Sequence, residues 1–184
     1  GWAAAIEAGD EALAARDYRA ARRQYRRAQR IAVAFGASDG RGAQTLTRLA
    51  RAYRAQGDFA KPEQLYDRVL EIAAQAHGPR SAEYARYLNE IGRYFHSRRK
   101  YARAEELYRK SFSIRLKLLG KEHPDVAEGI GNLAILYENQ ARYAQAEVYY
   151  RHCLEIREKQ LGLEHIETIT TLEHLARLLH KMNR

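Results

Sequence analysis

The chain has 184 residues and a formal net charge of +9 at pH 7, with 32 Lys and Arg against 23 Asp and Glu. It contains only three prolines, and Ala, Leu, Glu and Arg far outnumber the β-branched residues, which excludes a sheet-rich fold and predicts an all-α protein. No run approaches the roughly 18 uncharged apolar residues of a membrane helix, so we expect a soluble protein with no membrane partner.

The N-terminal segment begins Gly1-Trp2-Ala3, without a basic and apolar leader. Either no signal exists or one was removed before this numbering begins. The compartment therefore stays open between the cytoplasm and, if a signal was removed, the periplasm.

The first expected hairpin covers about residues 1–36. Tyr18, Ala21, Tyr25 and Ala28 recur at helical spacing and predict an amphipathic helix. The segment 2–15 reads as its less regular partner helix, and together they fit the later pattern with one residue deleted.

Downstream, the chain repeats itself every 42 residues, which predicts a stack of repeats around one continuous core. Each period holds two apolar helical stripes joined by a short polar turn, the pattern of an antiparallel helix hairpin. A small residue recurs where the paired helices must approach closely. The glycines that mark the period are Gly36, Gly78, Gly120 and Gly162, and the small positions are Ala50, Gly92, Ala134 and Ala176.

The period fixes where the hairpins are expected. We predict one array over 1–184, with hairpins over about 1–36, 43–78, 85–120 and 127–162, and an unpaired terminal helix over 167–182.

Three segments carry a resemblance to a known family. They are Leu119–Ala127 (LGKEHPDVA), Asn132–Tyr137 (NLAILY) and Arg142–Glu147 (RYAQAE), which resemble the 42-residue tetratricopeptide repeat (TPR) of kinesin light chains and their bacterial relatives. The resemblance covers nearly the whole chain. It implies a right-handed α-solenoid of antiparallel helix hairpins, the TPR superhelix, that acts as a non-enzymatic protein-binding scaffold. The Ala- and Arg-rich composition favours a bacterial relative.

The resemblance also implies a concave groove, lined by the first helix of each hairpin. Guanidinium groups form forked hydrogen bonds to carboxylates, and asparagine amides can pair with a peptide backbone. We therefore predict an acidic extended peptide or partner protein as the ligand, with five arginines supplying charge and two asparagines, Asn89 and Asn132, pairing with backbone. The predicted groove residues are Arg48, Arg51, Arg54, Arg86, Asn89, Arg93, His96, Asn132 and Asn139.

Three alternatives stay open. The arginines could form an ordinary solvated face with ion pairs. The chain could assemble with itself, for example as a homodimer, through its convex side and its terminal helix, on which we expect Leu175, Leu178, Leu179 and Met182 to be exposed. A pI near 9.7 attracts nucleic acid, but we consider it a poorer partner, because the basic run 98–103 lies on a turn and helix start.

The sequence offers little for catalysis, metal or cofactor binding. It shows no Gly-rich phosphate loop and no nucleophile elbow, so we predict neither an enzyme nor a cofactor. His123 and His165 fall in the turns between repeats, where a structural role is expected instead of metal ligation. The single cysteine, Cys153, excludes an internal disulfide and is expected to be a packed, inert thiol.

Overall fold

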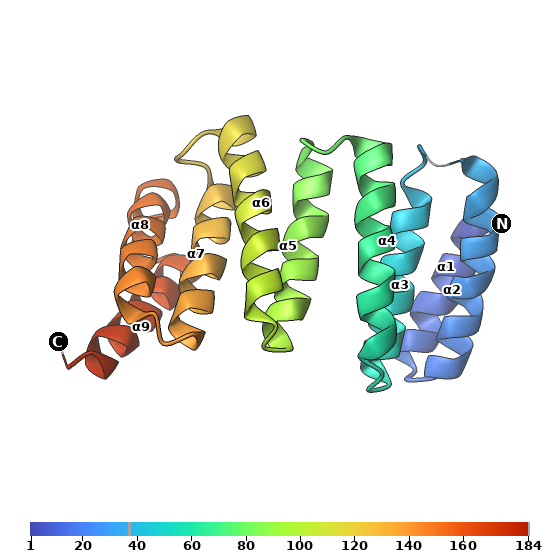
Figure 1. Cartoon of the computed structure of the whole chain (residues 1–184), viewed down its shortest axis with the longest axis horizontal. Helices are drawn as coiled ribbons and strands as arrows, with labels where there is room; N and C mark the ends of the chain where they lie inside the picture. Colours follow the sequence, from blue (N-terminus) through green and yellow to red (C-terminus); the bar gives the residue numbers. More distant parts are fainter. Residues whose placement is uncertain (37, 184) are drawn as a thin grey trace. The chain divides into compact units, whose positions relative to one another are not determined.

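The computed structural model describes residues 1–36 and 38–183, and within them it contains nine α-helices, one 3-10 helix and no strand (Figure 1). The all-α prediction is confirmed. None of the described helices is long and apolar enough to cross a membrane. The elements are α1 (Trp2–Ala14), α2 (Tyr18–Ala32), η1 (Val33–Phe35), α3 (Arg41–Ala55), α4 (Ala60–His77), α5 (Ala82–Ser97), α6 (Tyr101–Leu119), α7 (Pro124–Asn139), α8 (Tyr143–Leu161) and α9 (Ile166–Lys181).

The helices divide into two compact units, unit 1 (Gly1–Tyr87) and unit 2 (Leu88–Arg184), with the boundary inside α5. Each unit contains a cluster of buried hydrophobic residues of its own. The expectation that residues 1–184 form one array stays a prediction.

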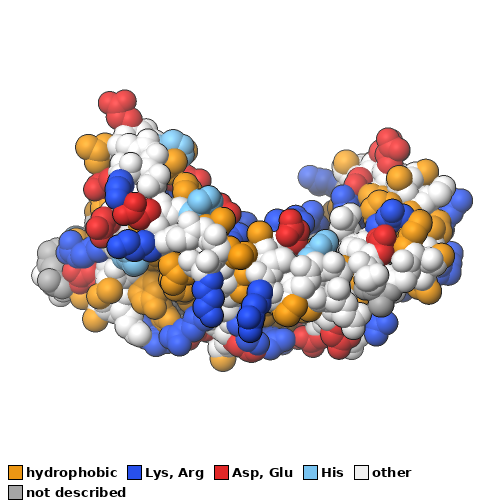
Figure 2. Space-filling view, turned by 90° about the horizontal axis from the view of Figure 1, so that it is seen from above, with side chains coloured by type: hydrophobic (Ala, Val, Ile, Leu, Met, Phe, Trp, Pro, Cys, Tyr) orange, Lys and Arg blue, Asp and Glu red, His pale blue; other side chains and the backbone are white. Residues whose placement is uncertain are grey.

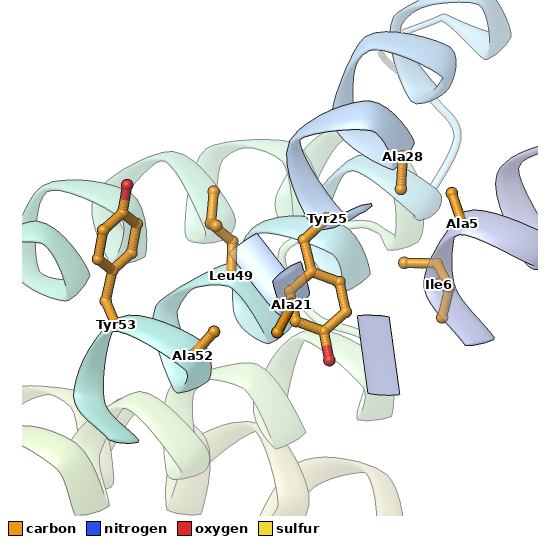
Figure 3. Packing of buried hydrophobic residues seen from close by; sticks show 8 residues of the cluster. All are labelled: Ala5, Ile6, Ala21, Tyr25, Ala28, Leu49, Ala52 and Tyr53. Atoms are coloured by element: carbon orange, nitrogen blue, oxygen red, sulfur yellow. The ribbon is translucent and has the colours of Figure 1, made fainter. Parts of the chain in front are cut away.

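In unit 1, consecutive helices pack in chain order, α1 on α2, α2 on α3 and α3 on α4. The contact between α1 and α2 centres on Tyr25, which is fully buried with Ala21 and Ala28 opposite Ile6 (Figure 3). Gly9 permits this packing, since a Cβ atom there would lie 2.4 Å from Cε1 of the Tyr25 ring. The small residues of α1 therefore let a bulky aromatic side chain fill the space between the helices.

Unit 2 follows the same plan, with α6 on α7, α7 on α8, and α8 on α9. Tyr108 of α6 and Tyr150 of α8 lie one 42-residue period apart, and each is 1% exposed. A Cβ atom on Gly92 would lie 2.7 Å from the ring of Tyr108. The small position predicted in α5 therefore accommodates this tyrosine.

The first helix of each hairpin ends in the same hydrogen-bonded cap. After α7, Arg142 N–H donates to Tyr137 C=O (2.9 Å) and Ala141 N–H to Glu138 C=O (3.0 Å), which defines a Schellman motif. The motif requires a left-handed residue, and Ala141 has a φ of 57°. Gly57 adopts this conformation after α3 with a φ of 87°, so the period places one glycine and one alanine at equivalent caps.

Ala141→Gly is expected to raise the free energy of unfolding by about 0.5–1 kcal/mol, because a Cβ is disfavoured in the left-handed region and glycine is not. Urea denaturation followed by circular dichroism measures the change. As the control, Ala176→Gly in the middle of α9 should instead lower the free energy of unfolding by about 1 kcal/mol. Losses of equal size in both variants would contradict this account of the cap.

Two histidines cap the helices that follow the predicted turns. His123 Nδ1 accepts a hydrogen bond from Asp125 N–H at the start of α7 (3.1 Å), and His165 Nδ1 accepts one from Glu167 N–H at the start of α9 (3.2 Å). Both are one period apart and play a structural role. No group of three or more potential metal ligands occurs within the described residues.

The terminal helix α9 differs from expectation in the face that it exposes. Leu175 is 6% exposed and Leu178 is fully buried, so the prediction that both are exposed was wrong. They lie on the buried side of α9, which packs against α8, and Leu179 and Met182 are partly buried. The large hydrophobic residues of α9 that are exposed are Ile166, Ile169 and Leu172.

Candidate functional site

The predicted groove residues fall into two sets, one in each unit. Unit 1 holds four of the arginines, and unit 2 holds the remaining arginine, the histidine and the asparagines. The unit 1 residues are Arg48, Arg51, Arg54 and Arg86, and the unit 2 residues are Asn89, Arg93, His96, Asn132 and Asn139.

All four predicted arginines of unit 1 already have interaction partners. Arg48 Nε donates to both carboxylate oxygens of Asp10, at 3.2 and 3.3 Å. The guanidinium carbon of Arg86 lies 5.3 Å from the ring centroid of Tyr87, within the range of a cation–π contact. For Arg48, the alternative of an ion-paired surface therefore describes the structure better than a free cationic site.

Unit 2 has a hollow of about 540 Å³ between α5 and α7, which we call the first hollow. Two arginines, Arg93 and Arg99, line it, and no carboxylate does. The complete lining is Arg93, His96, Ser97, Arg99, Tyr101, Tyr108, Asn132, Ile135 and Asn139. The first hollow is thus a basic site with an aromatic and aliphatic floor.

A second hollow of about 250 Å³ lies between α7 and α9 and shares Asn132 and Ile135 with the first. Its lining carries both signs of charge, since Glu128 and Glu167 face it together with Arg157. Acidic and basic side chains also lie next to one another on the visible face toward the C-terminal end, at the left of Figure 2. The two hollows together form the unit 2 groove, which is basic at one end and mixed at the other.

Asn132 is held in place by a chain of hydrogen bonds. Its Nδ2 donates to Asn89 Oδ1 (2.9 Å), and Asn89 Nδ2 donates to Glu128 Oε1 (3.0 Å). Glu128 also accepts from the buried Arg115 through Oε2 (2.6 Å). Since Asn89 is only 6% exposed, it orients Asn132 instead of facing a ligand. Within the described part of the chain, Asn132 Oδ1 accepts no hydrogen bond and stays open to one.

Arg93 supplies the positive charge of the first hollow. Its side chain is exposed, and no carboxylate among the described residues forms an ion pair with it. Arg99 lies in the turn after α5 and adopts the left-handed conformation of the cap, with a φ of 57°. The cap conformation of the backbone therefore fixes the position from which the Arg99 side chain extends.

His96 is the polar link between the floor and rim of the first hollow. Asn139 Nδ2 lies 2.8 Å from His96 Nε2, and Tyr108 Oη lies 3.4 Å from His96 Nδ1. Burial lowers the pKa of His96 from its ordinary value of 6.5. His96 is therefore neutral at pH 7 and adds hydrogen-bonding capacity, not charge.

The stability of the protein is expected to fall as the pH drops below about 6.5. Burial lowers the pKa of His96, and burial followed by the charge of Arg177 lowers the pKa of His174. Between the lowered pKa values and 6.5 the unfolded chain binds more protons than the folded chain, so the free energy of unfolding decreases as the pH falls through this window. Urea denaturation at about pH 7.5 and 5.5 measures the loss.

The His96→Gln, His174→Gln double variant should lose less stability over the same interval, because glutamine does not titrate. His152→Gln, at an exposed position of α8, serves as the control and should behave like the wild type. A double variant with an undiminished loss would show that other groups cause the pH dependence.

Sequence reasoning missed several residues of the unit 2 groove. Arg99 was placed in a turn expected only to join helices, and Arg157 was not assigned a role. The available signal was position, because a turn that ends the first helix of a hairpin lies beside the predicted concave face. The chain of contacts from Asn89 to Arg115 could not be predicted from the sequence, because its members come from three helices.

The tetratricopeptide repeat family model matches residues 41–117, 97–159 and 125–184. The chain belongs to the tetratricopeptide repeat family. TPR arrays are generally protein-interaction scaffolds and generally non-catalytic. The chain has no match among curated proteins.

Solved structures agree with the TPR assignment in fold. BtubC (BKLC) from P. vanneervenii is 24% identical with a TM-score of 0.82, over 95% of this chain and 70% of that one. Kinesin light chain-type TPR-like repeats from P. anserina are 21% identical with a TM-score of 0.81, over 96% and 84% of the two chains. These likenesses confirm the helical-solenoid fold. The bacterial origin of this TPR protein stays a prediction.

Proposed function

We propose that the unit 2 groove binds an extended acidic peptide segment of a partner protein. The observation that carries the proposal is the first hollow, which is lined by Arg93 and Arg99 and by no carboxylate. A guanidinium group without a carboxylate partner favours an anionic ligand, and its planar fork matches a carboxylate. The acidic side chain of the peptide would therefore occupy the first hollow.

Asn132 supports a peptide backbone as the second element of recognition. It lies on the wall shared by both hollows, and its amide is oriented by Asn89 while its Oδ1 has no donor among the described residues. An amide oxygen without a donor can accept a hydrogen bond from a backbone N–H of an extended ligand. Ile135, which also lines both hollows, offers apolar surface beside it.

The second hollow restricts the sequence of the ligand. Its carboxylates, Glu128 and Glu167, repel acidic side chains, although Arg115 and Arg157 pair with them at 2.6 and 3.2 Å. We therefore expect ligands with an acidic residue at one end and uncharged or basic residues at the other. A uniformly acidic peptide should bind less tightly than one with this asymmetry.

A binding screen with acidic, neutral, basic and asymmetric peptide pools tests the proposal, with light scattering of the same samples. Selective capture of the asymmetric acidic pool by a monomer is the expected result. Equal binding of all pools would contradict it. A dimer without peptide preference would favour the second candidate, self-assembly, which the exposed Ile166, Ile169 and Leu172 of α9 support.

A further inference from the structure

The outward face of α2 in unit 1 consists entirely of arginine. At 100° per residue, its six arginines occupy a sector of about 140°, and no other residue of α2 falls within that sector. The buried residues Ala21, Tyr25, Ala28 and Ala32 lie on the opposite side of the helix. We call this surface the α2 arginine face; its residues are Arg19, Arg22, Arg23, Arg26, Arg27 and Arg30.

No acidic residue neutralises the α2 arginine face. Across residues 1–36 and 38–183, none of its members forms an ion pair with a carboxylate. Two of them are instead held by Tyr53 of α3, whose hydroxyl accepts a hydrogen bond from Arg26 Nη2 (2.7 Å) and whose ring lies 5.1 Å from the Arg22 guanidinium carbon. The face is therefore partly ordered while its charge stays unpaired.

This arrangement works against the stability of the helix. Each arginine of the face has another three or four residues away, and like charges at these spacings destabilise a helix. An ordinary solvated helix face mixes both signs of charge. A ligand of high negative charge density would relieve the repulsion, and the hollow of about 420 Å³ lined by Arg19, Arg22, Arg23, Arg26 and Arg30 gives it a place to bind.

The composition of the face discriminates among polyanions. A protein partner is normally held by apolar and aromatic anchors, and a membrane surface by inserted apolar side chains, but this sector contains neither. Single-stranded nucleic acid is bound by aromatic residues that stack on bases, which are also absent from it. The polyanion that fits the face best is a duplex, which presents a rigid row of phosphates that can be contacted without access to the bases.

We propose that the α2 arginine face binds the phosphate backbone of double-stranded nucleic acid without sequence preference. Guanidinium groups donate paired hydrogen bonds to phosphate oxygens, and counterion release supplies most of the affinity. The basic run 98–103, on which the expectation against nucleic acid rested, plays no part. The site is in unit 1 and is independent of the unit 2 groove.

Fluorescence anisotropy with a mixed-sequence DNA duplex tests the proposal over a range of salt concentrations. With five arginines engaged, the slope of log affinity against log salt is expected to be about −4.5. The Arg19→Gln, Arg23→Gln, Arg30→Gln variant should reduce the magnitude of that slope by about 2.7 and the affinity by roughly 100-fold in about 0.15 M salt. These three side chains are exposed and glutamine keeps their helix propensity, so the variant should melt no lower than the wild type.

A matched control removes the same charge elsewhere. Arg80→Gln, Lys117→Gln, Lys121→Gln changes three exposed cations, and its slope and affinity should stay close to the wild type. Arg93→Glu should likewise retain duplex binding. Equal losses in the α2 variant and the control would overturn the proposal, because the net charge of the protein would then explain duplex binding without the α2 arginine face.

Polyglutamate and phosphatidylserine vesicles serve as competing anions in the same assay. Duplex binding that exceeds the binding of both, and of a single strand of the same sequence, is the expected result. If the α2 variant instead loses only polyglutamate or only vesicle binding, the face serves an acidic protein or a membrane and the proposal is wrong.

Discussion

Tyr150→Ala is expected to lower the free energy of unfolding by about 4 kcal/mol, because it empties a large, closely packed site in the core of unit 2. Tyr150 is 1% exposed, and its ring stacks on His174 with centroids 5.6 Å apart. Its hydroxyl donates to Glu138 Oε2 at 2.8 Å, and Glu138 Oε1 accepts from Lys181 at 2.7 Å. The side chain therefore joins α7, α8 and α9, and its removal leaves both a cavity and a weakened link between these helices.

Tyr150→Phe separates the ring from the hydroxyl. It should cost only about 1–2 kcal/mol, because the packed volume stays and Glu138 keeps Lys181 as a partner. Urea denaturation of both variants and the wild type gives the two losses. If phenylalanine costs as much as alanine, the polar link and not the buried ring holds unit 2 together.

Reversing the charge of Arg93 is expected to have the largest effect on ligand binding. Arg93→Glu removes the charge-assisted hydrogen bond that we propose between Arg93 and the peptide, and it places a like charge against the acidic side chain. The combined loss is about 2–3 kcal/mol, which is roughly 30- to 150-fold in Kd. Isothermal titration with a peptide selected in the screen measures it, and binding should weaken as salt is added.

Lys117→Glu is the matched control for this variant. Lys117 lies on α6, is exposed and lines neither hollow. Its substitution by glutamate therefore changes the net charge as much as Arg93→Glu does, but outside the groove. Its effect should be less than threefold, about 0.6 kcal/mol. An equal loss in both variants would mean that the overall charge of the protein, not the first hollow, attracts the peptide.

The helical repeat could be predicted because it depends on patterns that are local in sequence. Glycines at a 42-residue interval end the second helix of each hairpin, and Gly78, Gly120 and Gly162 all adopt positive φ values there. Apolar residues at helical spacing place Leu46 and Leu133 in the core, where both are buried. Each of these features depends only on residues within one repeat, so the local sequence pattern is enough to predict it.

The candidate site was less predictable because it depends on contacts between repeats. The pairing of Arg48 with Asp10 crosses the hairpin that has one residue deleted, so the 42-residue period gives no register for it. The orienting role of Asn89 follows from its burial against Glu128 and Asn132, which a helical periodicity does not report. Leu172 of α9 lies one 42-residue period after the buried Ile130, yet Leu172 is 39% exposed, because no helix among the described residues follows α9 to cover that face.

A charge-exchange experiment tests the central claim, that the first hollow of unit 2 holds an acidic side chain of an extended peptide. The binding of the selected peptide and of its Lys-substituted form is measured against the wild type and Arg93→Glu. We predict that the wild type prefers the acidic peptide and that Arg93→Glu prefers the lysine form. If Arg93→Glu loses the acidic peptide without gaining the lysine form, Arg93 does not contact that side chain and the proposed site is wrong.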